Sequence, residues 1–226
     1  MSFTWSWSKL NNFETCGFRH LKIAIQRLFR EDDTNPILVE GNVIHDAMAA
    51  RVLKGTPLPG PMVPFEYWAN RVATGAGELI VEQMFSLTKM LLPCPKNSPN
   101  VWLRVKVDAA RVCGPVGLAI DWKSGKRKEA TVQLALAAQC LFSYYPALEI
   151  VESKFIWLQS DEEDVERYTR DSIKDIWIGP PHNLLQRVGR MEIAAQQQNY
   201  PQTPSGLCKR YCPVSVCPHY QKGTPR

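Results

Sequence analysis

Two segments of alternating side chains flank a turn and constrain the fold more than any other feature. Within 101–123, apolar and polar residues alternate over 104–109, and the alternation resumes over 118–123. Alternation with a period of two predicts half-buried β-strands, and Gly114-Pro115 between the segments supplies turn residues. The sequence therefore predicts an antiparallel hairpin centred on Gly114-Pro115.

A hairpin with this register has two chemically different faces. Side chains two residues apart on a strand point to the same face, and residues opposed across the hairpin share a face. One face is expected to present Lys106, Asp108, Asp121 and Lys123. The other face is expected to bury Val105, Val107, Ile120 and Trp122.

The acidic pair Asp108 and Asp121 indicates a metal site. Opposed residues on antiparallel strands have Cβ atoms about 4.5–5.5 Å apart, so two carboxylates there repel each other. A divalent cation such as Mg²⁺ offsets the repulsion and also binds phosphate oxygens, and Lys123 beside it can assist a water molecule or stabilise negative charge. The Asp-x-Lys pattern is short, and Glu152-Ser-Lys154 is similar to it, but only Asp121 has an acid facing it.

The rest of the chain predicts helices and further strands around this hairpin. Apolar residues three and four apart predict helices, and runs rich in β-branched and aromatic residues predict strands. Helices are expected at 6–29 with a break at Cys16-Gly17, at 37–53, over 65–92 in one or two pieces, at 129–145 and at 182–198. Strands are expected at 150–158 and 165–170. The expected fold class is α/β, with a small mixed central sheet flanked by helices in a single domain.

Charge and hydropathy indicate which partners and which cellular location to expect for this chain. The chain has 27 Lys+Arg and 22 Asp+Glu, a net charge of +5, which suits a polyanionic partner but also an ordinary mixed-charge surface. No apolar run reaches the roughly 18 residues of a membrane span, and the N-terminal segment lacks the pattern of a signal peptide. We therefore expect a cytoplasmic protein without a membrane partner.

The cysteines indicate a second metal centre. The chain has seven cysteines, an odd number that disfavours a disulfide framework in a reducing compartment. Three of them cluster near the C-terminal end, and a fourth lies near the other end. The candidate ligands are Cys16, Cys208, Cys212 and Cys217. Four thiolates suit an iron–sulfur cluster or a closed zinc site, and for zinc His20 and His219 are further candidates.

The order of these motifs resembles the PD-(D/E)XK nuclease superfamily, in particular its RecB-type branch, which includes CRISPR-associated and AddB-like iron–sulfur nucleases and phage exonucleases. The resemblance runs through most of the chain. It is carried by Cys16 in Phe-Glu-Thr-Cys, Gly41-Asn-Val-Ile-His45, Asp108, Asp121-Trp-Lys123, Gln133 and the terminal cysteines. One residue departs from it: Ala137 stands where the Gln-x-x-x-Tyr motif has tyrosine, which puts the stacking or hydrogen-bonding role of that motif in doubt.

The resemblance implies a restriction-endonuclease-like core and a set of site residues. The implied ligands of a catalytic Mg²⁺ or Mn²⁺ are His45, Asp108, Asp121 and the backbone carbonyl of Trp122. Lys123 and Gln133 complete the catalytic set, and Glu82 is implied as a further ligand or a DNA-facing charge. For the cysteines the resemblance favours a [4Fe–4S] cluster over zinc, in a subdomain of about residues 1–30 and 200–220 that joins the two ends of the chain.

The implied activity is metal-dependent hydrolysis of DNA phosphodiester bonds, with an exonuclease of DNA processing, recombination or repair as the expected type. A phage origin and a recombination or replication protein as partner are expected from the resemblance alone. Candidate DNA contacts are Lys106, Lys126, Arg127 and Lys128, although the last three equally fit a solvated loop. Two alternatives stay open: a catalytically silent DNA-binding or assembly module with the same fold, and a zinc-based nucleic-acid adaptor without a catalytic metal.

Overall fold

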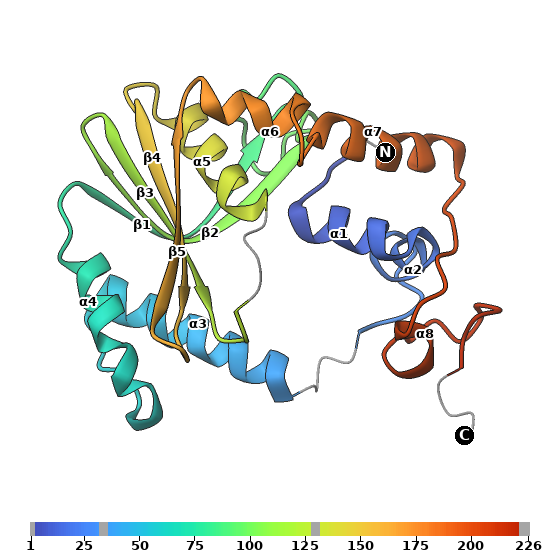
Figure 1. Ribbon diagram of the computed structural model, residues 1–226, viewed down its shortest axis with the longest axis horizontal. Helices are drawn as coiled ribbons and strands as arrows, with labels where there is room; N and C mark the ends of the chain where they lie inside the picture. Colours follow the sequence, from blue (N-terminus) through green and yellow to red (C-terminus); the bar gives the residue numbers. More distant parts are fainter. Residues whose placement is uncertain (1–2, 32–35, 128–131, 222–226) are drawn as a thin grey trace. The chain divides into compact units, whose positions relative to one another are not determined.

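The computed structural model describes residues 3–31, 36–127 and 132–221, which form two compact units (Figure 1). The sheet unit consists of Met1–Thr4 and Ile37–Leu184. The cysteine unit consists of Trp5–Pro36 and Leu185–Arg226. In the described ranges, no helix is both long enough and apolar enough to cross a membrane.

A five-stranded sheet of order β1-β2-β3-β4-β5 forms the centre of the sheet unit (Figure 1). Its strands are β1 (Glu78–Leu87), β2 (Leu103–Cys113), β3 (Val116–Lys123), β4 (Ile150–Trp157) and β5 (Glu162–Thr169). Neighbouring strands are antiparallel except β3 and β4, which are parallel and are connected through α5 (Val132–Tyr144). The sheet is therefore mixed, and the predicted α/β class is confirmed.

Helices cover both faces of this sheet (Figure 1). On one face, α3 (Pro36–Lys54) and α4 (Glu66–Ala73) pack around Ile120 and Trp122, with the 3-10 helix Gly60–Phe65 before α4. On the other face lies α5, whose Leu134 packs with Phe155 and Trp157 of β4. The short helices Ser172–Lys174 and α6 (Asp175–Ile178) follow β5. The burial of apolar side chains on both faces explains why the central strands are largely hydrophobic.

The predicted hairpin of β2 and β3 is confirmed. Its paired residues run from Cys113 and Val116 next to the turn to Ala109 and Ile120. Gly114 has a φ of 56°, a left-handed conformation that glycine adopts without strain. Asp108 and Asp121 therefore lie one residue beyond the last paired positions, where the ladder of this hairpin ends.

The prediction of helix throughout 65–92 is wrong, because β1 occupies its second half. Ile80, Met84 and Leu87 have the spacing of one helix face, so the local pattern favours a helix although the segment forms a strand. Gly77 marks the change from helix to strand. Its φ is 87°, and a Cβ there would lie 2.1 Å from the carbonyl oxygen of Val112, so only glycine fits.

The β1 strand changes its buried face at Glu82. Val81 packs against the cluster under α3 and α4, whereas Phe85 packs against Tyr144 of α5, with ring centroids 4.8 Å apart. In an unbroken strand, residues four apart share a face. The strand must therefore rotate between Val81 and Phe85, and Glu82 in this interval has a φ of 53°.

The rotation of β1 also affects its neighbour β2, whose residues on either side of Asp108 face different helices. Val105 pairs with Phe85 and therefore lies on the α5 face of the sheet. The prediction that Val105 is buried beside Ile120 and Trp122 is wrong for this reason. Ala109 is the β2 residue in that cluster.

The cysteine unit contains α1 (Trp7–Thr15), α2 (Gly17–His20), a π-helical turn (Leu21–Ile25), α7 (Leu184–Gln197) and α8 (Leu207–Arg210). The predicted break in the first helical segment is confirmed, because Cys16 is extended with φ −167° and ψ 109°. Arg187 of α7 holds Glu14 of α1 through two hydrogen bonds of 2.7 and 2.6 Å. The segment after α7 approaches Gly17 so closely that a Cβ there would lie 2.8 Å from the Pro201 ring.

We predict that Arg111→Leu lowers the free energy of unfolding by about 2 kcal/mol, because its guanidinium holds carbonyls of Val72, Ala73 and Gly77 between α4 and β1. Arg104→Leu on the same strand removes one carbonyl contact, to Lys96, and should cost less than about 1 kcal/mol. Urea unfolding followed by circular dichroism compares the two variants. Equal losses would contradict a special role for Arg111.

Candidate metal and catalytic site

Asp108 joins α3 to β3 at the end of the hairpin ladder. Its Oδ2 accepts a hydrogen bond of 2.9 Å from the backbone N–H of Trp122 and lies 3.2 Å from Nδ1 of His45. The side chain is only 9% exposed. One buried carboxylate thus fixes the positions of the helix that carries His45 and of the strand that carries the predicted catalytic pair.

Glu82 stands opposite Asp108, between the paired positions of β1 and β2. One ligand atom each from His45, Glu82 and Asp108 lie within 4.8 Å of one another. Oε1 of Glu82 is buried and has no hydrogen-bond partner, while its other oxygen pairs with Lys106. Two carboxylates and an imidazole form a donor set that fits Mg²⁺ or Mn²⁺, and the unpartnered Oε1 is an available ligand atom.

Asp121, Lys123 and Gln133 form a closed set of contacts beside α5. The ammonium of Lys123 lies 2.5 Å from Oδ2 of Asp121 and donates to Oε1 of Gln133 at 3.1 Å. The amide nitrogen of Gln133 donates to the other oxygen of Asp121. The Phe155 ring lies under the ammonium, 4.6 Å from centroid to Nζ. These contacts leave Lys123 little freedom to move.

The ionisable side chains around Asp108 and those around Asp121 shift one another's pKa values. Burial, together with the neighbouring Asp108 carboxylate, raises the pKa of Asp121 to about 6, although Lys123 and His45 lower it. The hydrogen bond with Asp108 raises the pKa of His45, against the effect of burial, and the charges of Asp121 and Glu82 raise it further. The structure therefore brings His45, Asp108 and Asp121 into one electrostatic environment, in which Lys123 pairs with Asp121 and Lys106 with Glu82. A bound cation would share these carboxylates with the two lysines.

Two further residues of the predicted motifs, Trp122 and Ala137, lie beside these carboxylates. Trp122 contributes its backbone N–H to Asp108, while ligation by its carbonyl stays a prediction. Ala137, which replaces the expected tyrosine, lines a small cavity with Asp121 and Gln133. A larger side chain at this position would occupy part of that cavity.

The predicted DNA-contacting residues differ in their surroundings. Lys106 is half exposed and pairs with Glu82. Arg127 pairs with Asp164 and Glu162 of β5, so it anchors the segment after Lys123. Lys126 is exposed, and Lys128 lies outside the described residues.

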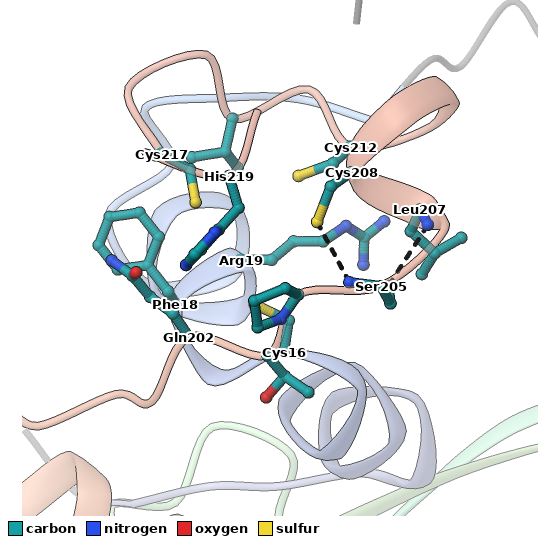
Figure 2. A pocket seen from close by; sticks show the side chains of 13 residues that line it. Cys16, Phe18, Arg19, Gln202, Ser205, Leu207, Cys208, Cys212, Cys217 and His219 are labelled. Atoms are coloured by element: carbon teal, nitrogen blue, oxygen red, sulfur yellow. Dashed lines mark hydrogen bonds between the residues drawn. The ribbon is translucent and has the colours of Figure 1, made fainter. Parts of the chain in front are cut away.

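The four predicted cluster cysteines line one cavity of the cysteine unit (Figure 2). Arg19 and His219 line it too, whereas His20 is buried against Phe13, and burial lowers the pKa of His20 to about 4. Among the described residues, only His45, Glu82 and Asp108 bring three ligand atoms within 4.8 Å of one another. No three of the sulfurs of Cys16, Cys208, Cys212 and Cys217 therefore all lie within 4.8 Å of one another.

Glu82 lies on strand β1 and not on the expected helix, and Arg19 of the cysteine cavity was not among the predicted site residues. Glu82 was expected on a helix, and the signal for a strand was the glycine pair before it together with the β-branched pair Ile80-Val81. Arg19 is three residues after Cys16, so one turn of helix brings it to the same side. That spacing was the available signal for its position.

No family model matches this chain, and no curated protein matches it. A solved structure from Eubacterium rectale, named "Putative exonuclease", aligns with 100% of this chain and 90% of its own, with a TM-score of 0.53 and 11% identity. The solved structure of SSO0001 aligns with 96% of this chain and 87% of its own, with a TM-score of 0.46 and 16% identity. The likeness to the first protein is one of fold alone, and it agrees with a mixed sheet flanked by helices.

Proposed function

We propose that this chain is a metal-dependent DNA nuclease, and specifically an exonuclease, that hydrolyses phosphodiester bonds. The observation that carries the proposal is the gathering of Asp108, Asp121 and Lys123 with His45 at the end of one hairpin. The fold neighbour from Eubacterium rectale is named as an exonuclease, and this name supports the activity proposed here.

The proposed cation ligands are His45, Glu82, Asp108 and Asp121, with the carbonyl of Trp122 as a further ligand. Oxygen-rich donor sets of this kind suit Mg²⁺ and Mn²⁺. When bound, the cation supplies Lewis acidity toward a phosphate oxygen and makes water a better nucleophile. The unpartnered Oε1 of Glu82 and the raised pKa of Asp121 both support a cation at this place.

Lys123 has the role of a fixed positive charge in the proposed reaction. Its ammonium is held by Asp121, Gln133 and the Phe155 ring, so it is oriented before substrate binds. A preoriented donor stabilises the charge that develops on a phosphate oxygen without the cost of reorganisation. Gln133 keeps Lys123 and Asp121 in this geometry.

We further propose that Cys16, Cys208, Cys212 and Cys217 hold a [4Fe–4S] cluster, with zinc as the alternative. All four cysteines line one cavity of the cysteine unit, which supports a shared metal centre. Four thiolates suit either metal, and the resemblance of the motifs favours the cluster. Its role would be structural, since metal binding couples to folding of the segments that carry the ligands.

The distribution of charge supports contact of the cysteine unit with DNA. This unit has 11 basic and 5 acidic residues, whereas the sheet unit has 16 basic and 17 acidic residues. Phosphate binding depends on lysine and arginine, so the basic excess suits a DNA backbone. In the sheet unit, Lys106, Lys126 and Lys128 are the proposed contacts near the reacting bond.

We predict that the chain purified without oxygen degrades end-labelled linear DNA with Mg²⁺ or Mn²⁺, not with EDTA, and leaves closed circular DNA intact. Asp121→Ala should lower the rate at least about 100-fold, because it removes a ligand and frees Lys123. The control is Asp171→Ala, since that carboxylate is 93% exposed and pairs only with Lys174 among the described ion pairs. Its rate should stay within about twofold of wild type.

Other outcomes of this assay contradict parts of the proposal. Cleavage of the circular DNA would replace the exonuclease with an endonuclease. DNA binding without cleavage under either cation would instead favour the catalytically silent DNA-binding module. Equal activity of Asp121→Ala and wild type would exclude this site from the reaction.

We predict that Glu82→Gln weakens Mn²⁺ binding about tenfold, because it replaces a charged ligand by a neutral one. Calorimetric titration at constant pH measures the affinity. The control Glu78→Gln lies on the same strand, where the carboxylate is exposed and accepts from the Tyr145 hydroxyl. An affinity that Glu82→Gln leaves unchanged would remove Glu82 from the ligand set.

We predict that Gln133→Leu lowers kcat about tenfold with little change in KM for DNA, because Lys123 and Asp121 lose the amide that orients them. Steady-state kinetics on linear DNA measure both constants. Gln196→Leu, at an exposed position of α7, serves as the control. A rise in KM at constant kcat would instead assign Gln133 to DNA binding.

A further inference from the structure

Arg19 is the charged residue in the wall of the cysteine cavity. Its guanidinium reaches between Cys16 and the pair Cys208 and Cys212 (Figure 2). Only 15% of the side chain is exposed, and Nη2 pairs with Glu31. The Nε–H is buried and has no hydrogen-bond partner. One polar group of this arginine is therefore available to something inside the cavity.

A buried donor without an acceptor is costly, typically about 1–3 kcal/mol and more for a charged group. Arginine has no other protonation state that would relieve this cost. The cysteine sulfurs are the neighbours that share the cavity wall with Arg19. Their thiolate form accepts hydrogen bonds and carries negative charge, so it offers what the Nε–H lacks.

One of these sulfurs already accepts a hydrogen bond. The backbone N–H of Ser205 donates to the sulfur of Cys208 at 3.5 Å (Figure 2). A backbone donor and the buried Nε–H of Arg19 thus both lie in the wall of one cavity.

Four thiolates remain negatively charged overall around a zinc ion or around a [4Fe–4S] core, since the metal charge does not cancel theirs. We propose that Arg19 is the counter-cation of this centre, donating through Nε to a cysteine sulfur and stabilising the negatively charged metal site. This inference rests on the cysteine centre of the proposed function, and it is independent of the nuclease activity. Hydrogen bonds and charges next to the sulfurs are what set the reduction potential of such clusters.

The test compares Arg19→Gln and Arg19→Lys with wild type, all purified without oxygen. Iron, acid-labile sulfide and zinc are measured first, and circular dichroism checks the fold of each variant. If iron and sulfide are present, a redox titration followed by visible absorption gives the midpoint potential. We expect Arg19→Gln to stabilise the reduced cluster about tenfold less, which lowers the potential by about 59 mV for one electron. Arg19→Lys should keep most of the wild-type value.

If zinc is present instead, competition with a chromogenic chelator at constant pH measures its affinity. Arg19→Gln should then bind zinc about tenfold more weakly, and Arg19→Lys within about threefold of wild type. If Arg19→Gln alone loses the metal of the cysteine centre while its circular dichroism spectrum is unchanged, that result also supports the role of Arg19. Glu31→Gln is the matched control, because it removes the other partner of Arg19 and leaves Nε in place.

Three results would overturn the inference. Arg19→Gln could equal wild type in potential or zinc affinity, Arg19→Lys could be as impaired as Arg19→Gln, or wild type could contain neither metal. The second result would mean that the shape of arginine matters and its charge does not. Asp121→Ala separates this inference from the nuclease proposal, since it should abolish DNA degradation and leave the iron, sulfide or zinc of the cysteine centre and its potential unchanged.

Discussion

The hydrogen bond from the Trp122 N–H to Asp108 is the contact on which the sheet unit's site depends. It occurs where the ladder of β2 and β3 ends, so a side-chain oxygen takes over a backbone donor that would otherwise be unpaired. The same oxygen lies against His45 of α3. A buried carboxylate is stable only when its charge is compensated. Trp122, His45 and, in the proposed function, a divalent cation all contribute to that compensation.

The rotation of β1 gives this carboxylate its acidic neighbour. Without a change of face at Glu82, the strand would present the same face to α3 and α4 along its whole length. The rotation places Val81 on one side of the sheet and Phe85 on the other, and Glu82 lies between them opposite Asp108. A left-handed φ at a glutamate is unfavourable, and it persists here because packing on both sides fixes the flanking residues.

The sequence predicted the parts of the fold in which local pattern and tertiary structure agree. The hairpin register followed from alternation and from Gly114-Pro115, and both survive in the structure. The β1 strand could not be predicted in this way, because the rotation at Glu82 removes the alternation on which strand prediction depends. The unpartnered Nε of Arg19 could not be predicted either, since it depends on how segments from both ends of the chain fold around one cavity. Spacing grouped Cys208, Cys212 and Cys217, the resemblance added Cys16, and the structure places all four around that cavity.

The two candidate metal centres have donor sets of opposite character, and this difference would sort their metals. The sheet unit offers carboxylate oxygens and one imidazole, which suit Mg²⁺ and Mn²⁺, whereas the cysteine unit offers thiolates, which suit iron–sulfur clusters and zinc. The chain places cationic groups beside both candidate centres. Lys106 and Lys123 pair with carboxylates of the first, and Arg19 shares the cavity wall with the cysteines of the second. Excess iron or zinc would therefore occupy the cysteine centre first, because the harder oxygen donors compete poorly for those metals.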